Sequence, residues 1–132
     1  MKQIFFAAAV LLVATVSAEA AGDPVAGEKV FNKCKICHNV GEGAKNKIGP
    51  ELNGIIGRKA ASVADFTGYG EGLKDMGAKG LVWDEAKLTE YLRNPKNFNP
   101  TTRMGFGGLP KDEDIADVLA YLGQFDADGK KK

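Results

Sequence analysis

Apolar residues recur at helical spacing in three stretches of the chain, and the clearest of these begins at Pro110. Its apolar positions follow the i, i+3, i+4, i+7 pattern of a half-buried helix, and they are Ile115, Val118, Leu119 and Leu122. Acidic residues at 112–114 lie in its first turn, where they favour the positive end of the helix dipole. This stretch predicts a helix near the C-terminus.

The other two stretches have clear start signals. Asp23 followed by Pro24 is typical of a helix cap with proline at the first helical position. Asp84 is the cap of a further helix, which we expect to end at Asn94, directly before Pro95. Three main helices are therefore predicted.

No stretch alternates apolar and polar residues over the length of a strand, so the predicted fold is all-α. The chain has 132 residues, which suits one domain, and 17 of them are glycines. We expect the glycine-rich segments 72–80 and 100–108 to be loops. Because glycine buries no side chain, the core of the protein itself is thin and needs another group to fill it.

The N-terminal segment has the features of a secretory signal. Lys2 precedes an apolar run from Ile4 to Val16, and an Ala-x-Ala cleavage pattern ends at Ala20. The alternative is an uncleaved membrane anchor, but the apolar run is short for a membrane span. We expect cleavage before Ala21 and export to the periplasm, without a membrane anchor.

This division gives three parts of the chain. Residues 1–20 are the predicted signal peptide, residues 21–125 the single domain, and residues 126–132 a polar, flexible tail. Basic and acidic residues nearly balance, 18 against 17, so no whole-chain charge favours nucleic acid. We expect a soluble monomer.

The two cysteines and the single histidine stand together as Cys34-Lys35-Ile36-Cys37-His38. A disulfide or a thioredoxin-like pair would not account for the adjacent histidine, and a zinc site made only of Cys and His would need four ligands. The remaining reading of Cys-x-x-Cys-His is covalent attachment of haem c. On a helix the two thiols would share one face, with the imidazole next to them.

Haem iron has two axial positions, and His38 can occupy one of them. The chain has no second histidine, so the other position takes a methionine, a lysine or nothing. Met76 and Met104 both lie in glycine-rich segments, and a thioether suits haem iron in electron-transfer proteins. Position alone leaves the assignment open, because Met76 could be an exposed loop residue and Met104 could fill a gap in the core.

At this point the chain resembles the class I c-type cytochromes, of the soluble bacterial cytochrome c2 type and close to mitochondrial cytochrome c. The resemblance runs from Gly27 to Phe125. Its motifs stand in the family order: Gly27-x-x-x-Phe31, Cys34-x-x-Cys37-His38, Gly49-Pro50-x-Leu52-x-Gly54, Gly57-Arg58-Lys59, Phe66-Thr67, Trp83, Tyr91-Leu92-x-x-Pro95, Pro100-x-Thr102-x-Met104-x-Phe106 and Ala120-Tyr121-Leu122. The ordered series is far more specific than any one motif.

The resemblance implies that Met104 is the second axial ligand and that the carbonyl of Pro50 accepts the other ring N–H of His38. It further implies that Trp83 and Arg58 bind a haem propionate. Tyr91 and Thr102 are implied to support the methionine side through hydrogen bonds. The implied fold is a small cytochrome c fold, in which three main helices, short ones and loops wrap around one haem. In that fold the first and last helices cross closely.

Several basic residues accompany the haem-binding segments, and by resemblance they surround the exposed haem edge. The candidates for docking a partner are Lys33, Lys47, Lys96 and Arg103. A basic front would steer the protein towards acidic surfaces of redox partners. The alternative is a solvated surface with no partner preference.

The sequence therefore predicts an electron-transfer protein and not an enzyme. The expected partners are a quinol-oxidising, bc1-type membrane complex or a periplasmic dehydrogenase as donor, and a terminal oxidase or photosynthetic reaction centre as acceptor. A gas sensor or haem enzyme with an open sixth coordination site is the alternative, and a tethered subunit of a larger complex is another.

Overall fold

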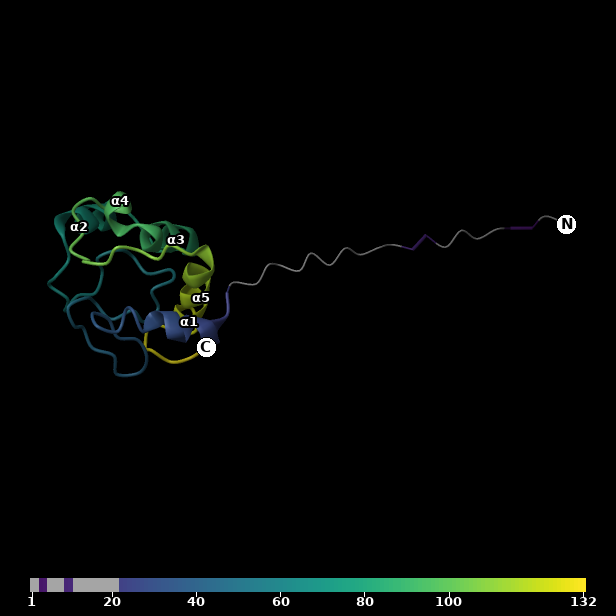
Figure 1. Ribbon diagram of the computed structural model, residues 1–132, viewed down its shortest axis with the longest axis horizontal. Helices are drawn as coiled ribbons and strands as arrows, with labels where there is room; N and C mark the ends of the chain where they lie inside the picture. The colour runs from purple at the N-terminus through teal and green to yellow at the C-terminus, as the bar shows by residue number, and fades with distance from the viewer. Residues whose placement is uncertain (1–2, 5–8, 11–21) are drawn as a thin grey trace.

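The computed structural model describes residues 3–4, 9–10 and 22–132, and this part of the chain is helical. Its helices, shown in Figure 1, are α1 (Pro24–Phe31), α2 (Glu71–Ala78), α3 (Glu85–Arg93), α4 (Pro95–Phe98) and α5 (Asp112–Leu122). The β-pairing among these residues consists of two isolated bridges. The all-α prediction is confirmed.

Helices α1 and α5 cross at one side of the molecule (Figure 1). Gly27 makes this possible, because a Cβ at this position would collide with the carbonyl of Asp117 and lie 2.9 Å from the Cβ of Tyr121. The ring of Phe31 packs on Tyr121 at 5.4 Å between centroids. The buried carboxylate of Asp117 also accepts the backbone N–H of Asp23 at 2.7 Å. The close crossing that the resemblance implied is present.

Helices α3 and α4 follow each other with one residue between them. The side chain of Asp84 accepts the N–H of Lys87 at 2.7 Å and caps α3 as predicted. Helix α3 ends at Arg93, one residue earlier than predicted, and Asn94 caps α4, where its side chain accepts the N–H of Asn97 at 3.2 Å. Helix α5 begins two residues later than predicted, because Lys111 takes the extended conformation of a cap.

The prediction of a loop at 72–80 is wrong, because Glu71–Ala78 forms α2. Leu73 packs against the hydrophobic core, and Gly77 lies so close to the carbonyl of Ala60 that a Cβ would collide with it. An ion pair between Lys79 and Asp75 at 2.9 Å spans its last turn. Tertiary packing has outweighed the poor helix propensity of two glycines.

Residues 126–132, expected to be a flexible tail, instead fold back on the domain, and we call them the C-terminal hook. The carboxylate of Asp126 accepts the N–H groups of Asp128 at 2.9 Å and Lys130 at 3.0 Å. The N–H of Lys132 donates to the carbonyl of Gln124 at 2.9 Å. An Asp side chain that closes a turn on its own backbone accounts for this conformation.

The bridge between Lys59 and Val82 brings two distant segments together. The backbone N–H of Trp83 donates to the carbonyl of Arg58 at 2.8 Å. The two residues expected to bind one carboxylate therefore come from adjacent backbone segments.

The predicted signal peptide and its cleavage point fall on segments that lie outside the described residues, apart from residues 3–4 and 9–10. Among the residues that are described, no helix has the length and apolar character needed to cross a membrane.

Candidate functional site

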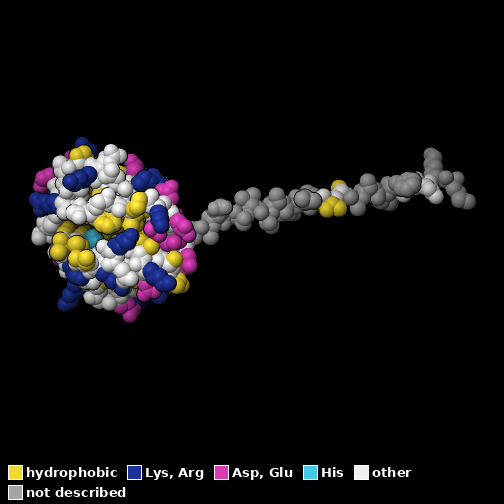
Figure 2. All heavy atoms as spheres, viewed as in Figure 1, with side chains coloured by type: hydrophobic (Ala, Val, Ile, Leu, Met, Phe, Trp, Pro, Cys, Tyr) yellow, Lys and Arg dark blue, Asp and Glu magenta, His cyan; other side chains and the backbone are white. Residues whose placement is uncertain are grey.

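A cavity of about 600 Å³ lies between the loops and helices α2, α3 and α5, a size typical of ligand and cofactor sites. Every residue predicted to surround a haem lines it: Cys34, Cys37, His38, Pro50, Arg58, Trp83, Tyr91, Thr102 and Met104. Figure 2 shows a hollow in which hydrophobic side chains gather beside the histidine. Residues distant in sequence therefore meet at one site.

The attachment motif occupies the turns that follow α1. The N–H groups of Cys37 and His38 both donate to the carbonyl of Cys34, at 3.1 Å and 2.9 Å. These turns keep the helix-like spacing that places both thiols on the cavity wall, although α1 itself ends at Phe31. Burial, with a smaller effect of Cys37, raises the pKa of the Cys34 thiol to about 11, so the free thiol is protonated at neutral pH.

The imidazole of His38 is held in one orientation. Its Nδ1 lies 2.7 Å from the carbonyl oxygen of Pro50, and since a carbonyl only accepts, Nδ1 carries the proton. Burial lowers the pKa of His38, and the ring is therefore neutral at pH 7. Nε2 is left with its lone pair, as a metal ligand requires.

On another part of the wall, Thr102 links two elements. Its hydroxyl lies 3.1 Å from the hydroxyl of Tyr91 on α3 and accepts the backbone N–H of Met104 at 3.2 Å. These two contacts fix the start of the glycine-rich loop that carries Met104. The other candidate ligand, Met76, lies on α2 and is not among the residues that line the cavity.

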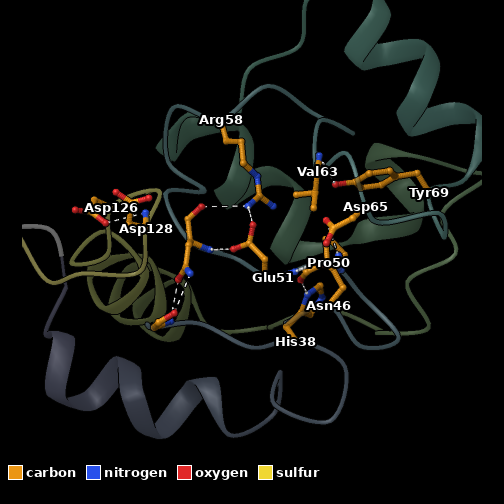
Figure 3. Close-up of polar contacts among 12 residues, drawn as sticks. His38, Asn46, Pro50, Glu51, Arg58, Val63, Asp65, Tyr69, Asp126 and Asp128 are labelled. Carbon is orange, nitrogen blue, oxygen red and sulfur yellow. Dashed lines mark hydrogen bonds and ion pairs between the residues drawn. The ribbon is translucent and has the colours of Figure 1, made fainter. Parts of the chain in front are cut away.

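Arg58 and Trp83 lie side by side on the cavity wall. The guanidinium of Arg58 donates to the carbonyl oxygen of Asn53 at 3.1 Å and to the carboxylate of Glu51 at 3.2 Å (Figure 3). Desolvation lowers the pKa of Arg58, and Glu51 opposes that shift. Trp83 is 5% exposed and packs on Tyr91 at 5.1 Å between ring centroids. The site thus has one buried indole and one cation that could bind a carboxylate.

One residue that bears on this site, Glu51, has no signal in the sequence. Glu51 was not singled out, because one acidic residue in a loop forms no pattern, and only the fold shows that it faces Arg58. Tyr69 is buried on the cavity wall, and its hydroxyl oxygen accepts the backbone N–H of Val63 at 3.2 Å. Its neighbour Phe66 packs against it edge to face at 4.8 Å.

The predicted docking residues are not all brought together. Lys33 and Arg103 line the cavity, whereas the ammonium of Lys47 donates to the carbonyl of Lys35 at 2.7 Å. Lys96 lies on α4 and is not among the residues that line the cavity. Two exposed apolar side chains that also line the cavity, Ile36 and Ile48, are each 74% exposed. The mouth of the cavity is therefore both apolar and basic.

The donor set fits a covalently attached haem. Two thiols, a neutral imidazole with a free Nε2, and a thioether line one cavity with mostly apolar walls. A Cβ at Gly49 would lie 2.8 Å from both ring nitrogens of His38, so the backbone there leaves room only for the imidazole. Within residues 22–132, no group of three or more His, Cys, Asp or Glu side chains is placed so that it could hold a metal ion.

Comparison with known proteins identifies the family to which the chain is similar. The family model for cytochrome c matches residues 24–126. Cytochrome c-554 of Methylosinus trichosporium is 54% identical over 133 residues, covering 100% of this chain and 98% of that protein. Cytochrome c2 of Afifella marina is 53% identical over 109 residues, covering 82% and 87%. The solved structure of cytochrome c2 from Rhodospirillum centenum superimposes with a TM-score of 0.75 at 38% identity, covering 80% of this chain and 99% of that one.

Proposed function

Because the chain belongs to the cytochrome c family, we propose that it is a periplasmic one-electron carrier whose haem iron is ligated by His38 and Met104. The family carries covalently bound haem c and transfers electrons, and its members of this type are not enzymes. When bound, haem c supplies an iron centre that changes its charge by one electron. Attachment would use the thiols of Cys34 and Cys37, which line the same cavity wall.

The observation that carries the proposal is the hydrogen bond between His38 and Pro50. At 2.7 Å it favours the tautomer in which Nε2 is free to ligate a metal. The Met104 loop is held by Thr102 and Tyr91 on the same cavity. A site with two strong ligands in place closes the iron to substrates, and this favours a carrier over a sensor or an enzyme.

Binding of the propionates would use Arg58 and Trp83. Both lie on the cavity wall, one with a positive charge and one with an indole donor. A donor and a charge that are already desolvated need little reorganisation when the charge of the centre changes. Pro50, Tyr91 and Thr102 would act on the ligands and not on the propionates.

The proposed partners are membrane redox complexes, with a quinol-oxidising complex or a periplasmic dehydrogenase as donor and an oxidase or reaction centre as acceptor. Lys33 and Arg103 lie at the cavity, and their charges support steered, short-lived docking there. We include Lys47 and Lys96 in the docking surface as its outer members. The transient nature of such contacts agrees with a monomer.

Substitution of the two internal methionines tests the ligation. We expect Met104→Ala to give a reduced protein that binds carbon monoxide, because the sixth position is then open. Met76→Ala is the matched control, since Met76 on α2 is not among the residues that line the cavity, and it should bind none. Carbon monoxide binding by Met76→Ala and not by Met104→Ala would overturn the assignment of Met104.

A further inference from the structure

Arg58 forms an ion pair with a residue that does not line the cavity. Its guanidinium lies 3.2 Å from one carboxylate oxygen of Glu51, and the other oxygen accepts the backbone N–H of Asn53 at 2.6 Å. Arg58 lines the cavity, whereas Glu51 does not. Figure 3 shows the carboxylate beside the guanidinium, near the segment that holds Pro50. Glu51 therefore holds Arg58 from behind.

The pair is poorly exposed to water. The side chains of Arg58 and Glu51 are 15% and 22% exposed, so solvent and salt screen their charges less than those of a surface pair. Asn53 reinforces the geometry, because its carbonyl oxygen accepts from the same guanidinium nitrogen at 3.1 Å. The electrostatic potential in the cavity therefore depends on both charges, the positive charge of Arg58 on the wall and the negative charge of Glu51 next to it.

Two more titratable groups face this region. The carboxylate of Asp65 accepts the side-chain amide of Asn46 at 3.0 Å, and Asn46 in turn accepts the N–H of Glu51. The phenol of Tyr69 lies within electrostatic range of Arg58, Glu51 and Asp65. Among these side chains Arg58 carries the positive charge, and Glu51 is the carboxylate in direct contact with it.

We propose that Glu51 is a positioning residue that holds the Arg58 guanidinium at the cavity wall and offsets its charge, and so lowers the reduction potential of the bound haem. A cation beside the centre disfavours the oxidised, more positive state, and an anion paired with that cation weakens this effect. The inference rests on the proposed function, since it concerns the same haem site.

Glu51→Gln in the haem-loaded protein tests the proposal. Glutamine keeps the size of the side chain and an acceptor for Asn53 but removes the charge. We expect the equilibrium constant for reduction to rise about threefold to tenfold, where tenfold corresponds to about 59 mV for one electron. The matched control is Asp112→Asn, which removes the carboxylate from an exposed pair with Arg93 whose side chains are 53% and 77% exposed.

We expect Asp112→Asn to change the equilibrium constant by less than twofold, because water screens this surface pair. A potential for Glu51→Gln that is no higher than that of Asp112→Asn overturns the proposal. Should Glu51→Gln fail to fold because Arg58 is left buried and unpaired, Arg58→Gln is compared with the double variant Glu51→Gln/Arg58→Gln.

The double variant removes both charges, and the proposal expects its potential to be higher than that of Arg58→Gln alone. Equal potentials would overturn the role of Glu51 in that background. If all of these proteins show a reversible one-electron couple but the reduction potential does not shift as expected, only the role of Glu51 is contradicted. If the unsubstituted, haem-loaded protein shows no reversible one-electron couple, the proposed function itself is contradicted.

Discussion

Nδ1 of His38 donates a hydrogen bond to the carbonyl oxygen of Pro50, and the two atoms are 2.7 Å apart. The residue before Pro50 is Gly49, whose missing side chain leaves the space in which the imidazole lies. A loop and the attachment motif are thus fitted to each other through one ring. Backbone atoms, more than side chains, set the orientation of the proposed iron ligand.

Gly49→Ala should displace that ring. A Cβ would lie 2.8 Å from both ring nitrogens and still closer to Cε1, so the imidazole or the loop must move. We expect a loss of about 1–3 kcal/mol in the free energy of unfolding and a lower yield of haem-loaded protein. Urea unfolding and absorption spectroscopy measure both.

The matched control is Gly107→Ala, because no atom lies within 4 Å of a Cβ built there. It should change the free energy of unfolding by less than about 1 kcal/mol. Equal effects of the two substitutions would show that the contact with His38 does not matter.

Acid should destabilise the protein through His38. Burial lowers the pKa of this histidine below its usual value of 6.5, so the folded state takes up the proton less readily than the unfolded state. The stability that it contributes is present above pH 6.5 and is lost as the pH falls through the lowered pKa. Iron bound at Nε2 would also require the neutral ring and would shift this loss of stability to still lower pH.

Urea unfolding between pH 7.5 and pH 4 measures this dependence. Because the chain has one histidine, no other imidazole contributes between pH 6.5 and the carboxylate range. A loss of stability centred above pH 6.5 would contradict the assignment of a neutral, buried His38.

Lys33→Gln should slow electron transfer to a partner. Lys33 lies at the cavity, and we expect the second-order rate with a purified quinol-oxidising complex to fall about twofold to fivefold at low ionic strength and less at high salt. Lys96→Gln should have a smaller effect of the same sign. Stopped-flow kinetics at several salt concentrations measure the rates.

Lys79→Gln is the control for these variants. Lys79 is the exposed C-cap of α2, and Asp75 pairs with it at 2.9 Å. If Lys33→Gln and Lys79→Gln reduce the rate equally, the charge at the cavity has no special part in docking.

Removal of the C-terminal hook, residues 126–132, should destabilise the domain. Gly129 lies so close to the carbonyl of Gly41 that a Cβ would collide with it, and Lys132 donates to Gln124 at 2.9 Å. Loss of these contacts should lower the free energy of unfolding by about 1–3 kcal/mol. Substitution of the three terminal lysines by glutamine tests charge alone and should leave stability within about 0.5 kcal/mol.

The helices with local signals could be predicted. Asp23 and Asp84 cap the helices that they were expected to cap, and Pro95 follows the end of α3. Helix α2 could not be predicted, because its glycines argue against a helix and its stability comes from packing against Ala60 and the core. The C-terminal hook could not be predicted either, because its conformation depends on contact with a distant loop at Gly41. A run of polar residues near a terminus does not indicate such a contact.

For the cavity, too, contiguous motifs could be predicted from the sequence, and contacts between distant segments could not. The Cys34-x-x-Cys37-His38 motif is contiguous, so the sequence alone predicts its chemistry. The pairing of Arg58 with Glu51 depends on how one loop turns, and no spacing rule predicts it. Met76 and Met104 both lie among glycines, so the sequence pattern does not distinguish them, whereas in the fold Met104 lines the cavity and Met76 does not.

Exposure of the reduced protein to carbon monoxide at neutral pH, followed by absorption spectroscopy, tests the central claim most directly. We expect no change of the spectrum, because the proposal assigns His38 and Met104 as the two protein ligands of the iron. Rapid binding of one carbon monoxide per haem would contradict it, and the protein would then be a sensor or an enzyme with an open sixth site.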